Sequence, residues 1–133
     1  GNFRDIDVED LTKHKMDSEQ MEINEQNANL INKTKEKENK VCIVGTTTMK
    51  AVETAAITGN RVKVYSGWSN KFIFPHYNFD IADAMITNFH PPLSSMLMMV
   101  SAFGGYDLIM EAYKHAVEKE YKFLTYGDAM LII

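Results

Sequence analysis

The sequence holds only one cysteine, and it has no long hydrophobic run. A single cysteine cannot form a disulfide within the chain, which is typical of a protein in a reducing compartment. No apolar stretch approaches the roughly 20 residues that a membrane-spanning helix needs, and the acidic first ten residues lack a signal-peptide core. We therefore predict a cytoplasmic protein without a membrane partner. Cys42 lies in the apolar segment VCIVG, which predicts a buried side chain.

An excess of positive charge and a metal-ligand pattern are lacking as well. The chain has 14 Lys and Arg against 18 Asp and Glu, a net charge of −4. A surface that neutralises many phosphates is normally basic, so charge alone does not indicate a nucleic-acid binder. No two residues have the spacing of a metal site, and we predict no bound metal. The four histidines are scattered along the chain: His14, His76, His90 and His115.

The sequence does contain enough apolar material for one folded domain. Its 133 residues are 45% hydrophobic and 24% charged, which is typical of a globular protein with a core of its own. The composition changes along the chain, because residues 1–40 are polar and almost every long apolar run falls within residues 41–133. We predict a single domain over residues 1–133, and the abrupt start suggests a piece of a longer chain.

Hydrophobic periodicity predicts strands that alternate with helices. A surface helix should begin after Asn24, with Ala28, Ile31 and Leu30 on its apolar stripe. Residues 41–59 should form a strand, a turn and a helix that Gly59 ends, with Met49, Val52, Ala55 and Ala56 on its apolar face. Further strands are predicted at 61–65, 70–79, 81–88 and 121–125, with a turn at 66–68 and a last apolar run at 129–133. Helices are predicted at 93–103, where Ser94 or Ser95 would be the N-cap, and at 106–120. The pattern predicts an α/β class, a three-layer domain whose mainly parallel or mixed sheet is flanked by helices.

The loop ITNFHPP, residues 86–92, is the first candidate for a functional segment. Its two adjacent prolines remove two backbone donors and fix two φ angles, so the segment should be a stiff loop. Asn88 and His90 would then be held at the exit of a strand, where binding and catalytic groups are often found. A simple connection from strand to helix explains the same residues.

Two further loops carry polar side chains after predicted strands. One is Gly45-Thr46-Thr47, at the start of a helix, where free backbone amides and hydroxyls can bind an anion or a ribose. It lacks the spacing of a phosphate-binding P-loop, and N-capping by threonine alone would account for it. The other is Tyr126-Gly127-Asp128. In parallel sheets the ligand crevice lies outside the carboxyl ends of the strands, so these loops would share one site if they meet at one edge.

Four segments in order carry a resemblance to a known family. They are VGTTTMKAVETA, GWSNKFIFPHYNF, DAMITNFHPPLSSMLMMVSAFGG and YKFLTYGDAMLII. They closely resemble the C-terminal part of the S-adenosylmethionine:tRNA ribosyltransferase-isomerases of queuosine biosynthesis. KHKMDSEQMEI also resembles the His-x-Met-x-Ser-Glu block of that family, so the similarity spans nearly the whole chain.

The resemblance implies an enzyme that is both a transferase and an isomerase in tRNA modification. It would move the ribosyl part of S-adenosylmethionine onto 7-aminomethyl-7-deazaguanine in tRNA and rearrange it to epoxyqueuosine, with release of adenine and methionine. S-adenosylmethionine would be a co-substrate, and tRNA would bind through the full-length enzyme. Family members also have an N-terminal portion and an inserted β-barrel domain, so this chain would be the C-terminal fragment of a longer two-domain enzyme and a partner of its N-terminal part.

Such a reaction needs a base that removes a proton from the carbon next to the sulfonium and an acid or donor that helps adenine to leave. His90 and Asp128 have the side chains for these catalytic tasks. The other candidates would bind substrate oxygens, and they are Thr46, Thr47, Asn88, Ser94, Ser95 and Gly127. His14 and Glu19 are weaker candidates for the same substrate-binding pocket.

Three departures from the family pattern favour an alternative function. The usual NFHLPKST is NFHPPLSS here, so Leu93 replaces a lysine, while Lys50 replaces an arginine and His76 a glycine. Loss of a positive charge, or of a bidentate guanidinium, would fit a non-catalytic fragment or paralogue that acts as a binding or assembly module. An unrelated nucleotide-binding α/β domain is a third hypothesis, based on Gly45–Thr48 alone.

Overall fold

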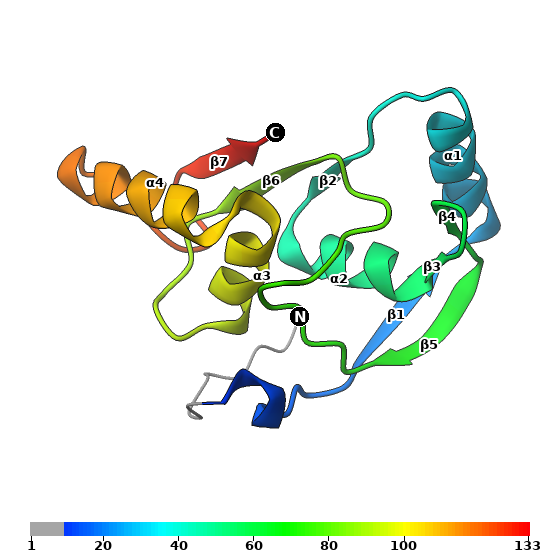
Figure 1. Cartoon of the computed structure of the whole chain (residues 1–133), viewed down its shortest axis with the longest axis horizontal. Helices are drawn as coiled ribbons and strands as arrows, with labels where there is room; N and C mark the ends of the chain where they lie inside the picture. Colours follow the sequence, from blue (N-terminus) through cyan, green and yellow to red (C-terminus); the bar gives the residue numbers. More distant parts are fainter. Residues whose placement is uncertain (1–9) are drawn as a thin grey trace.

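The computed structural model describes residues 10–133 (Figure 1). The helical elements are η1 (Leu11–Lys13), α1 (Glu25–Glu36), α2 (Thr46–Ala55), α3 (Ser95–Gly104) and α4 (Tyr106–Glu118). The strands are β1 (Glu19–Ile23), β2 (Cys42–Val44), β3 (Ala56–Ile57), β4 (Arg61–Val62), β5 (Tyr65–Ser69), β6 (Ala84–Asn88) and β7 (Ala129–Ile132).

A three-stranded sheet in the order β2-β6-β7 positions the candidate loops. β2 and β6 run parallel, whereas β7 runs antiparallel to β6. The chain passes through α2 between the parallel strands, as a parallel pair requires a long crossover. The predicted α/β class with a mixed sheet and flanking helices is therefore confirmed.

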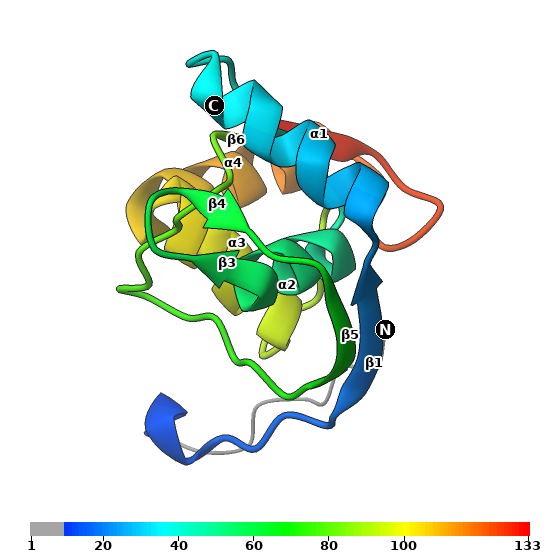
Figure 2. The same ribbon diagram turned by 90° about the vertical axis from the view of Figure 1, so that its right-hand side faces the viewer.

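Two smaller antiparallel pairs lie beside this sheet. β1 pairs with β5, and β3 pairs with β4; Figure 2 shows β1 and β5 side by side along one edge of the molecule. α1 is fastened to β4 by the buried amide of Asn32, which donates to the Val62 carbonyl at 2.9 Å and accepts from the Val62 amide at 2.8 Å. Because the Asn32 side chain both donates and accepts a hydrogen bond, its buried oxygen and nitrogen both have partners.

α2 lies at the centre of the core (Figure 1). Met49, Val52 and Ala55 on one face of this helix are almost fully buried, as the sequence predicts. They pack in one cluster with Met85 of β6 and Val100 of α3. The position of the α2 N-terminus is therefore fixed by close packing.

Several local predictions are confirmed by capping contacts. The Asn24 side chain accepts a hydrogen bond from the Asn27 amide at the start of α1. Ser94, one of two predicted caps, accepts from the Leu97 amide at the start of α3. These short-range contacts depend on residues close in sequence, which explains why they could be predicted.

Other local predictions are wrong. α2 ends at Ala55 instead of Gly59, because the chain turns into β3 and Gly59, with φ of +87°, lies in the hairpin to β4. Residues 66–68 lie inside β5, while residues 70–79 and 121–125 form turns and irregular chain. Leu30 is 64% exposed, and Cys42 is exposed as well, since alternate residues of β2 point away from the core.

Candidate functional site

The three candidate loops meet at one edge of the β2-β6-β7 sheet. Because β2 and β6 are parallel, Val44 and Asn88 end their strands at the same edge. β7 begins there, with Ala129 paired to Asn88. A cavity of about 890 Å³ lies between the first two loops and the residues on either side of the third, Leu124, Thr125 and Ala129. The residues that line it are Val44, Gly45, Thr46, Thr47, Thr48, Ile86, Thr87, Asn88, His90, Pro91, Met96, Leu124, Thr125 and Ala129.

The N-terminus of α2 forms one wall of this cavity. Gly45 occupies the N-cap position with φ of +89°, a conformation that L side chains rarely adopt. Glycine has no side chain to accept hydrogen bonds, so the prediction that threonine alone caps this helix is wrong. Thr46 is buried, whereas Thr47 and Thr48 are exposed at the cavity. Free amides at a helix N-terminus carry a partial positive charge and attract anions.

His90 also lines the cavity and is held at two points. Its Nε2 lies 2.8 Å from the Thr87 hydroxyl, and its backbone amide donates to the Tyr113 hydroxyl at 2.7 Å. Only 9% of the residue is exposed, although it contributes to the cavity lining. Burial lowers the pKa of His90 to about 4, because an apolar environment disfavours the charged imidazolium. The ring is therefore neutral at pH 7.

This pKa predicts how stability depends on pH. The unfolded chain protonates His90 near its ordinary pKa of 6.5, but the folded chain does so only near 4. As the pH falls from 6.5 to 4, the unfolded state binds the extra proton and the fold loses up to about 3 kcal/mol. Urea unfolding across this pH range should show that loss, and the curve of His90→Gln should be flatter by the same amount. Coinciding curves for the two proteins would contradict the pKa assignment.

Asn88 joins two of the loops. Its side-chain amide donates to the backbone oxygens of Gly127 and Asp128, at 3.3 and 3.2 Å. This contact holds the 124–129 segment beside the end of β6. Asn88 also lines the cavity.

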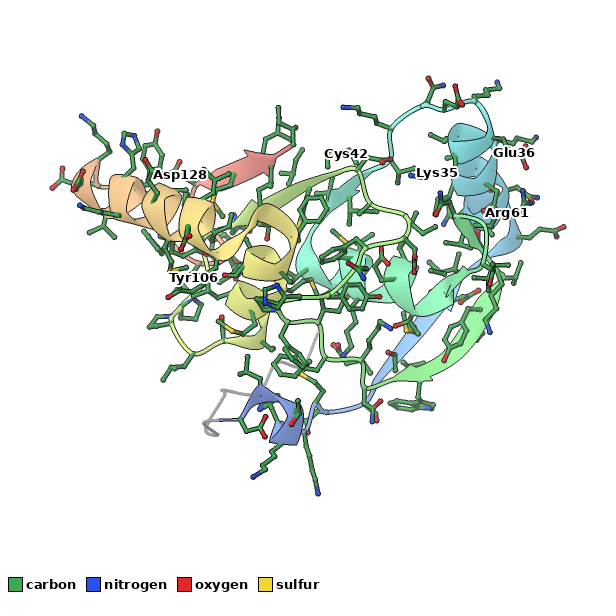
Figure 3. The ribbon with its side chains drawn as sticks, viewed as in Figure 1. Lys35, Glu36, Cys42, Arg61, Tyr106 and Asp128 are labelled. Atoms are coloured by element: carbon green, nitrogen blue, oxygen red, sulfur yellow. The ribbon has the colours of Figure 1, made fainter. Side chains whose placement is uncertain are left out.

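Asp128 is next in sequence to Ala129, which lines the cavity, but its carboxylate makes a structural hydrogen bond. It accepts a hydrogen bond from the Lys122 amide at 2.8 Å and so closes the turn between α4 and β7. Figure 3 shows the residue at this turn. Asp128 and Gly127 are both outside the cavity lining that the described residues form.

Gly127 is required by a close approach of the backbone. A Cβ atom at this position would lie 2.3 Å from the Lys122 carbonyl oxygen. We expect Gly127→Ala to lower the free energy of unfolding by about 1–3 kcal/mol, as overpacking does. Gly67→Ala is the matched control, since its Cβ would meet only the Tyr65 side chain, at 3.3 Å. Thermal unfolding measures both, and equal melting temperatures would contradict the explanation.

The two predicted serines cap or enter α3. Ser94 Oγ donates to the Pro91 carbonyl and accepts from the Leu97 amide, so both interactions are structural. Ser95 Oγ is buried and has no hydrogen-bond partner among the described residues. Neither serine is in the lining of the cavity that residues 10–133 form.

His14 and Glu19 belong to another part of the molecule. His14 is buried against Phe72, with ring centroids 4.7 Å apart, and its Nε2 has no partner among residues 10–133. Glu19 accepts a hydrogen bond from the buried Lys50 ammonium at 2.7 Å, which ties β1 to α2. Among the described residues, the cavity lining includes neither of them.

The candidate list from the sequence omits the residues that orient His90. Thr87 lies three positions before His90 on a buried strand, and the spacing in the ITNFH segment is the signal that could have found it. Tyr113 lies on α4, far away in the sequence, and no local pattern connects it to the loop. Thr48 and Thr125 also line the cavity.

The comparisons with known proteins agree with this geometry. The sequence matches the family described as queuosine biosynthesis protein over residues 1–132. The chain belongs to this family. A relative from Phocaeicola vulgatus, named S-adenosylmethionine:tRNA ribosyltransferase-isomerase, is 58% identical over all of this chain and 38% of its own length. A relative of the same name from Bacteroides fragilis is 59% identical over the same shares.

A solved member of the family has the same fold. The crystal structure of S-adenosylmethionine tRNA ribosyltransferase from Thermotoga maritima is 41% identical, with a TM-score of 0.79. The alignment covers 84% of this chain and 39% of that one. The chain thus spans about two fifths of the length of the relatives that it matches.

Residues 10–133 lack two structural features. None of the helices there is long and apolar enough to cross a membrane. No group of three or more His, Cys, Asp or Glu side chains in that range is arranged to hold a metal ion.

Proposed function

We propose that this chain is the C-terminal part of an S-adenosylmethionine:tRNA ribosyltransferase-isomerase and that its sheet-edge cavity forms part of the S-adenosylmethionine site. The observation that carries the proposal is the meeting of the 45–48 loop, the 87–91 loop and the residues that flank the third loop around one cavity, in a chain about 58% identical to relatives with that name. A volume of about 890 Å³ is within the range of small-molecule sites.

The walls of the cavity suit the two ends of this substrate. The N-terminus of α2, Thr47 and Thr48 line the cavity, where free amides and hydroxyls would bind an anionic group such as the methionine carboxylate. In this proposal Asn88 and Thr46, which also line the cavity, bind ribose oxygens. The apolar residues Val44, Ile86 and Met96 offer a surface for the adenine ring.

His90 is the base in this proposal. A neutral imidazole can accept the proton on the carbon next to the sulfonium, whose positive charge makes that carbon acidic. For Nδ1 to accept it, Nε2 must carry the hydrogen and donate to the Thr87 hydroxyl, 2.8 Å away. The low pKa keeps the ring unprotonated at pH 7. Asp128, with its carboxylate on the Lys122 amide, acts by holding the adjoining loop.

Release of adenine tests the proposed function. Purified full-length enzyme should release adenine from S-adenosylmethionine when tRNA with the 7-aminomethyl-7-deazaguanine base is added, and unmodified tRNA should give no release. Chromatography of the products measures both reactions. A folded enzyme that releases no adenine with either tRNA would support the binding-module hypothesis instead.

A further inference from the structure

One aromatic side chain next to the cavity lining is completely exposed. Tyr126 is 100% exposed, although the residue before it, Thr125, lines the cavity. Three other rings of this region, those of Phe89, Tyr113 and Phe123, pack against one another, with centroids 5.1 to 5.8 Å apart. Figure 2 shows the chain between α4 and β7 as a loop that projects from the rest of the molecule.

The loop that carries this tyrosine is held firmly by backbone contacts. The Leu124 amide donates a hydrogen bond to the Phe89 carbonyl at 2.9 Å. The Asp128 amide donates to the Lys122 carbonyl at 2.8 Å, and the Asp128 carboxylate accepts from the Lys122 amide at the same distance. The backbone is therefore fixed on both sides of the exposed ring.

The loop also contains a backbone conformation that is uncommon. Leu124 has φ of +71°, in the left-handed region that residues with a large side chain rarely adopt. The same residue lines the cavity and is 56% exposed. Such conformations persist only where the surrounding contacts hold them, and they cluster at binding and catalytic sites. The backbone of this loop thus resembles that of a binding loop.

A fixed loop with an exposed aromatic ring is suited to bind a planar partner. Because the backbone is already ordered, binding costs less conformational entropy than it would on a mobile loop. Every nucleobase has a face that can stack on an aromatic side chain. Proteins that recognise RNA commonly stack unpaired bases in this way.

Two planar groups would come to this site in the proposed reaction, adenine and the base that accepts the ribosyl group. Adenine is joined to the ribose that binds inside the cavity, whereas Tyr126 lies outside the lining that residues 10–133 form. The acceptor base belongs to a macromolecule and must approach the cavity from outside. A ring next to the lining, but not part of it, fits the acceptor base better than adenine.

We propose that Tyr126 stacks on the 7-deazaguanine base of the tRNA and so directs its aminomethyl arm toward the cavity. This inference rests on the proposed function, which supplies the identity of the acceptor. The stacking would also offset part of the cost of removing the base from the stack of its neighbours in the tRNA.

Binding of tRNA to the full-length enzyme tests the stacking without any reaction, if S-adenosylmethionine is left out. Tyr126→Ala should weaken the binding of tRNA that carries the 7-aminomethyl-7-deazaguanine base by about 5- to 150-fold, the usual effect of losing one stacked base. Tyr126→Phe keeps the ring and should bind within about 2-fold of the wild type. Fluorescence anisotropy at one fixed salt concentration gives each Kd.

Two controls show whether the base is the partner of the ring. Tyr106→Ala removes a ring that is 58% exposed at the start of α4, where Figure 3 labels it, and should leave the Kd unchanged. The second control is the same tRNA without a base at the target nucleotide. The wild type and Tyr126→Ala should bind this abasic tRNA equally, because the ring has lost its partner.

Three results would overturn the proposal. One is equal affinity of the wild type and Tyr126→Ala for the tRNA with the base. Another is the same loss of affinity with both tRNAs, which would mean that the ring contacts a different part of the tRNA. The third is a Tyr126→Ala enzyme with unchanged tRNA affinity but a raised KM for S-adenosylmethionine or a lowered melting temperature, since adenine or another protein segment would then be the partner.

The same measurements separate this inference from the proposed function. An enzyme that releases no adenine, but loses affinity in Tyr126→Ala only when the base is present, would refute the proposed function and support the stacking. An enzyme that releases adenine and binds the tRNA equally well with and without the ring would do the opposite.

Discussion

Adenine release by the full-length enzyme should fall about 10²–10⁴-fold when His90 is replaced by alanine, which is the usual contribution of a positioned base. The imidazole is neutral, lines the cavity and is held by Thr87 and Tyr113. Loss of the ring removes the proton acceptor while the cavity walls from α2 and β7 stay in place. We therefore expect the effect mainly on kcat, measured by chromatography of adenine under saturating S-adenosylmethionine.

Two controls separate catalysis from folding. His115→Ala removes an imidazole that is exposed on α4 and is not among the described residues that line the cavity, so its rate should equal that of the wild type. Thr87→Val should shift the pH profile of kcat, because the hydroxyl that fixes the His90 tautomer is lost, whereas Thr87→Ser should restore it. A His90→Ala enzyme that is folded and as fast as the wild type would remove His90 from the mechanism.

Glu53→Ala should cause the largest loss of stability, about 3–5 kcal/mol of the free energy of unfolding. The carboxylate is 3% exposed and accepts hydrogen bonds from the backbone amides of residues 80, 81 and 82, at 3.0–3.3 Å. Alanine would leave these donors without an acceptor, and each unsatisfied buried group costs about 1–3 kcal/mol. Urea unfolding measures the loss.

The same contacts predict the behaviour of the control variants. Glu53→Gln keeps one carbonyl oxygen and should lose less stability than alanine does. Glu111→Ala removes an exposed acid of α4 and should change stability by less than about 0.5 kcal/mol. Equal midpoints for Glu53→Ala and Glu111→Ala would show that the carboxylate does not hold the 80–82 segment.

Glu53 connects the core to the candidate site. The segment that it holds leads directly into β6, the strand that carries Thr87 and Asn88. Burial, and then the charge of Glu53, raise the pKa of the neighbouring Tyr77, so that phenol stays neutral beside the carboxylate. α2 thus positions two walls of the cavity, one with its N-terminus and one through Glu53.

Contacts between residues close in sequence were the predictable part of the fold. The Asn24 and Ser94 caps and the buried stripe of α2 follow from short-range patterns. The placement of the 45–47 and 86–92 loops at one sheet edge followed from the rule for parallel strands, once β2 and β6 were predicted correctly. The 126–128 loop lies at that edge for another reason, because it precedes the antiparallel strand β7 instead of leaving a strand at 121–125.

Long-range contacts explain what the sequence did not predict. Glu53 on a helix looks like a surface acid until residues 80–82 are seen to cover it. Tyr113 reaches the His90 amide from a helix 23 positions away. Asp128 lies in the expected loop, but its side chain is fixed by the Lys122 amide, a contact that no periodicity indicates.

A crystal structure of the full-length enzyme with S-adenosylmethionine, in the absence of tRNA, tests the central claim most directly. The account predicts electron density for the nucleoside between the N-terminus of α2 and His90, with Asn88 and Thr47 within hydrogen-bonding distance. Density for an intact S-adenosylmethionine at another place, with the 45–48 and 87–91 loops unoccupied, would contradict it.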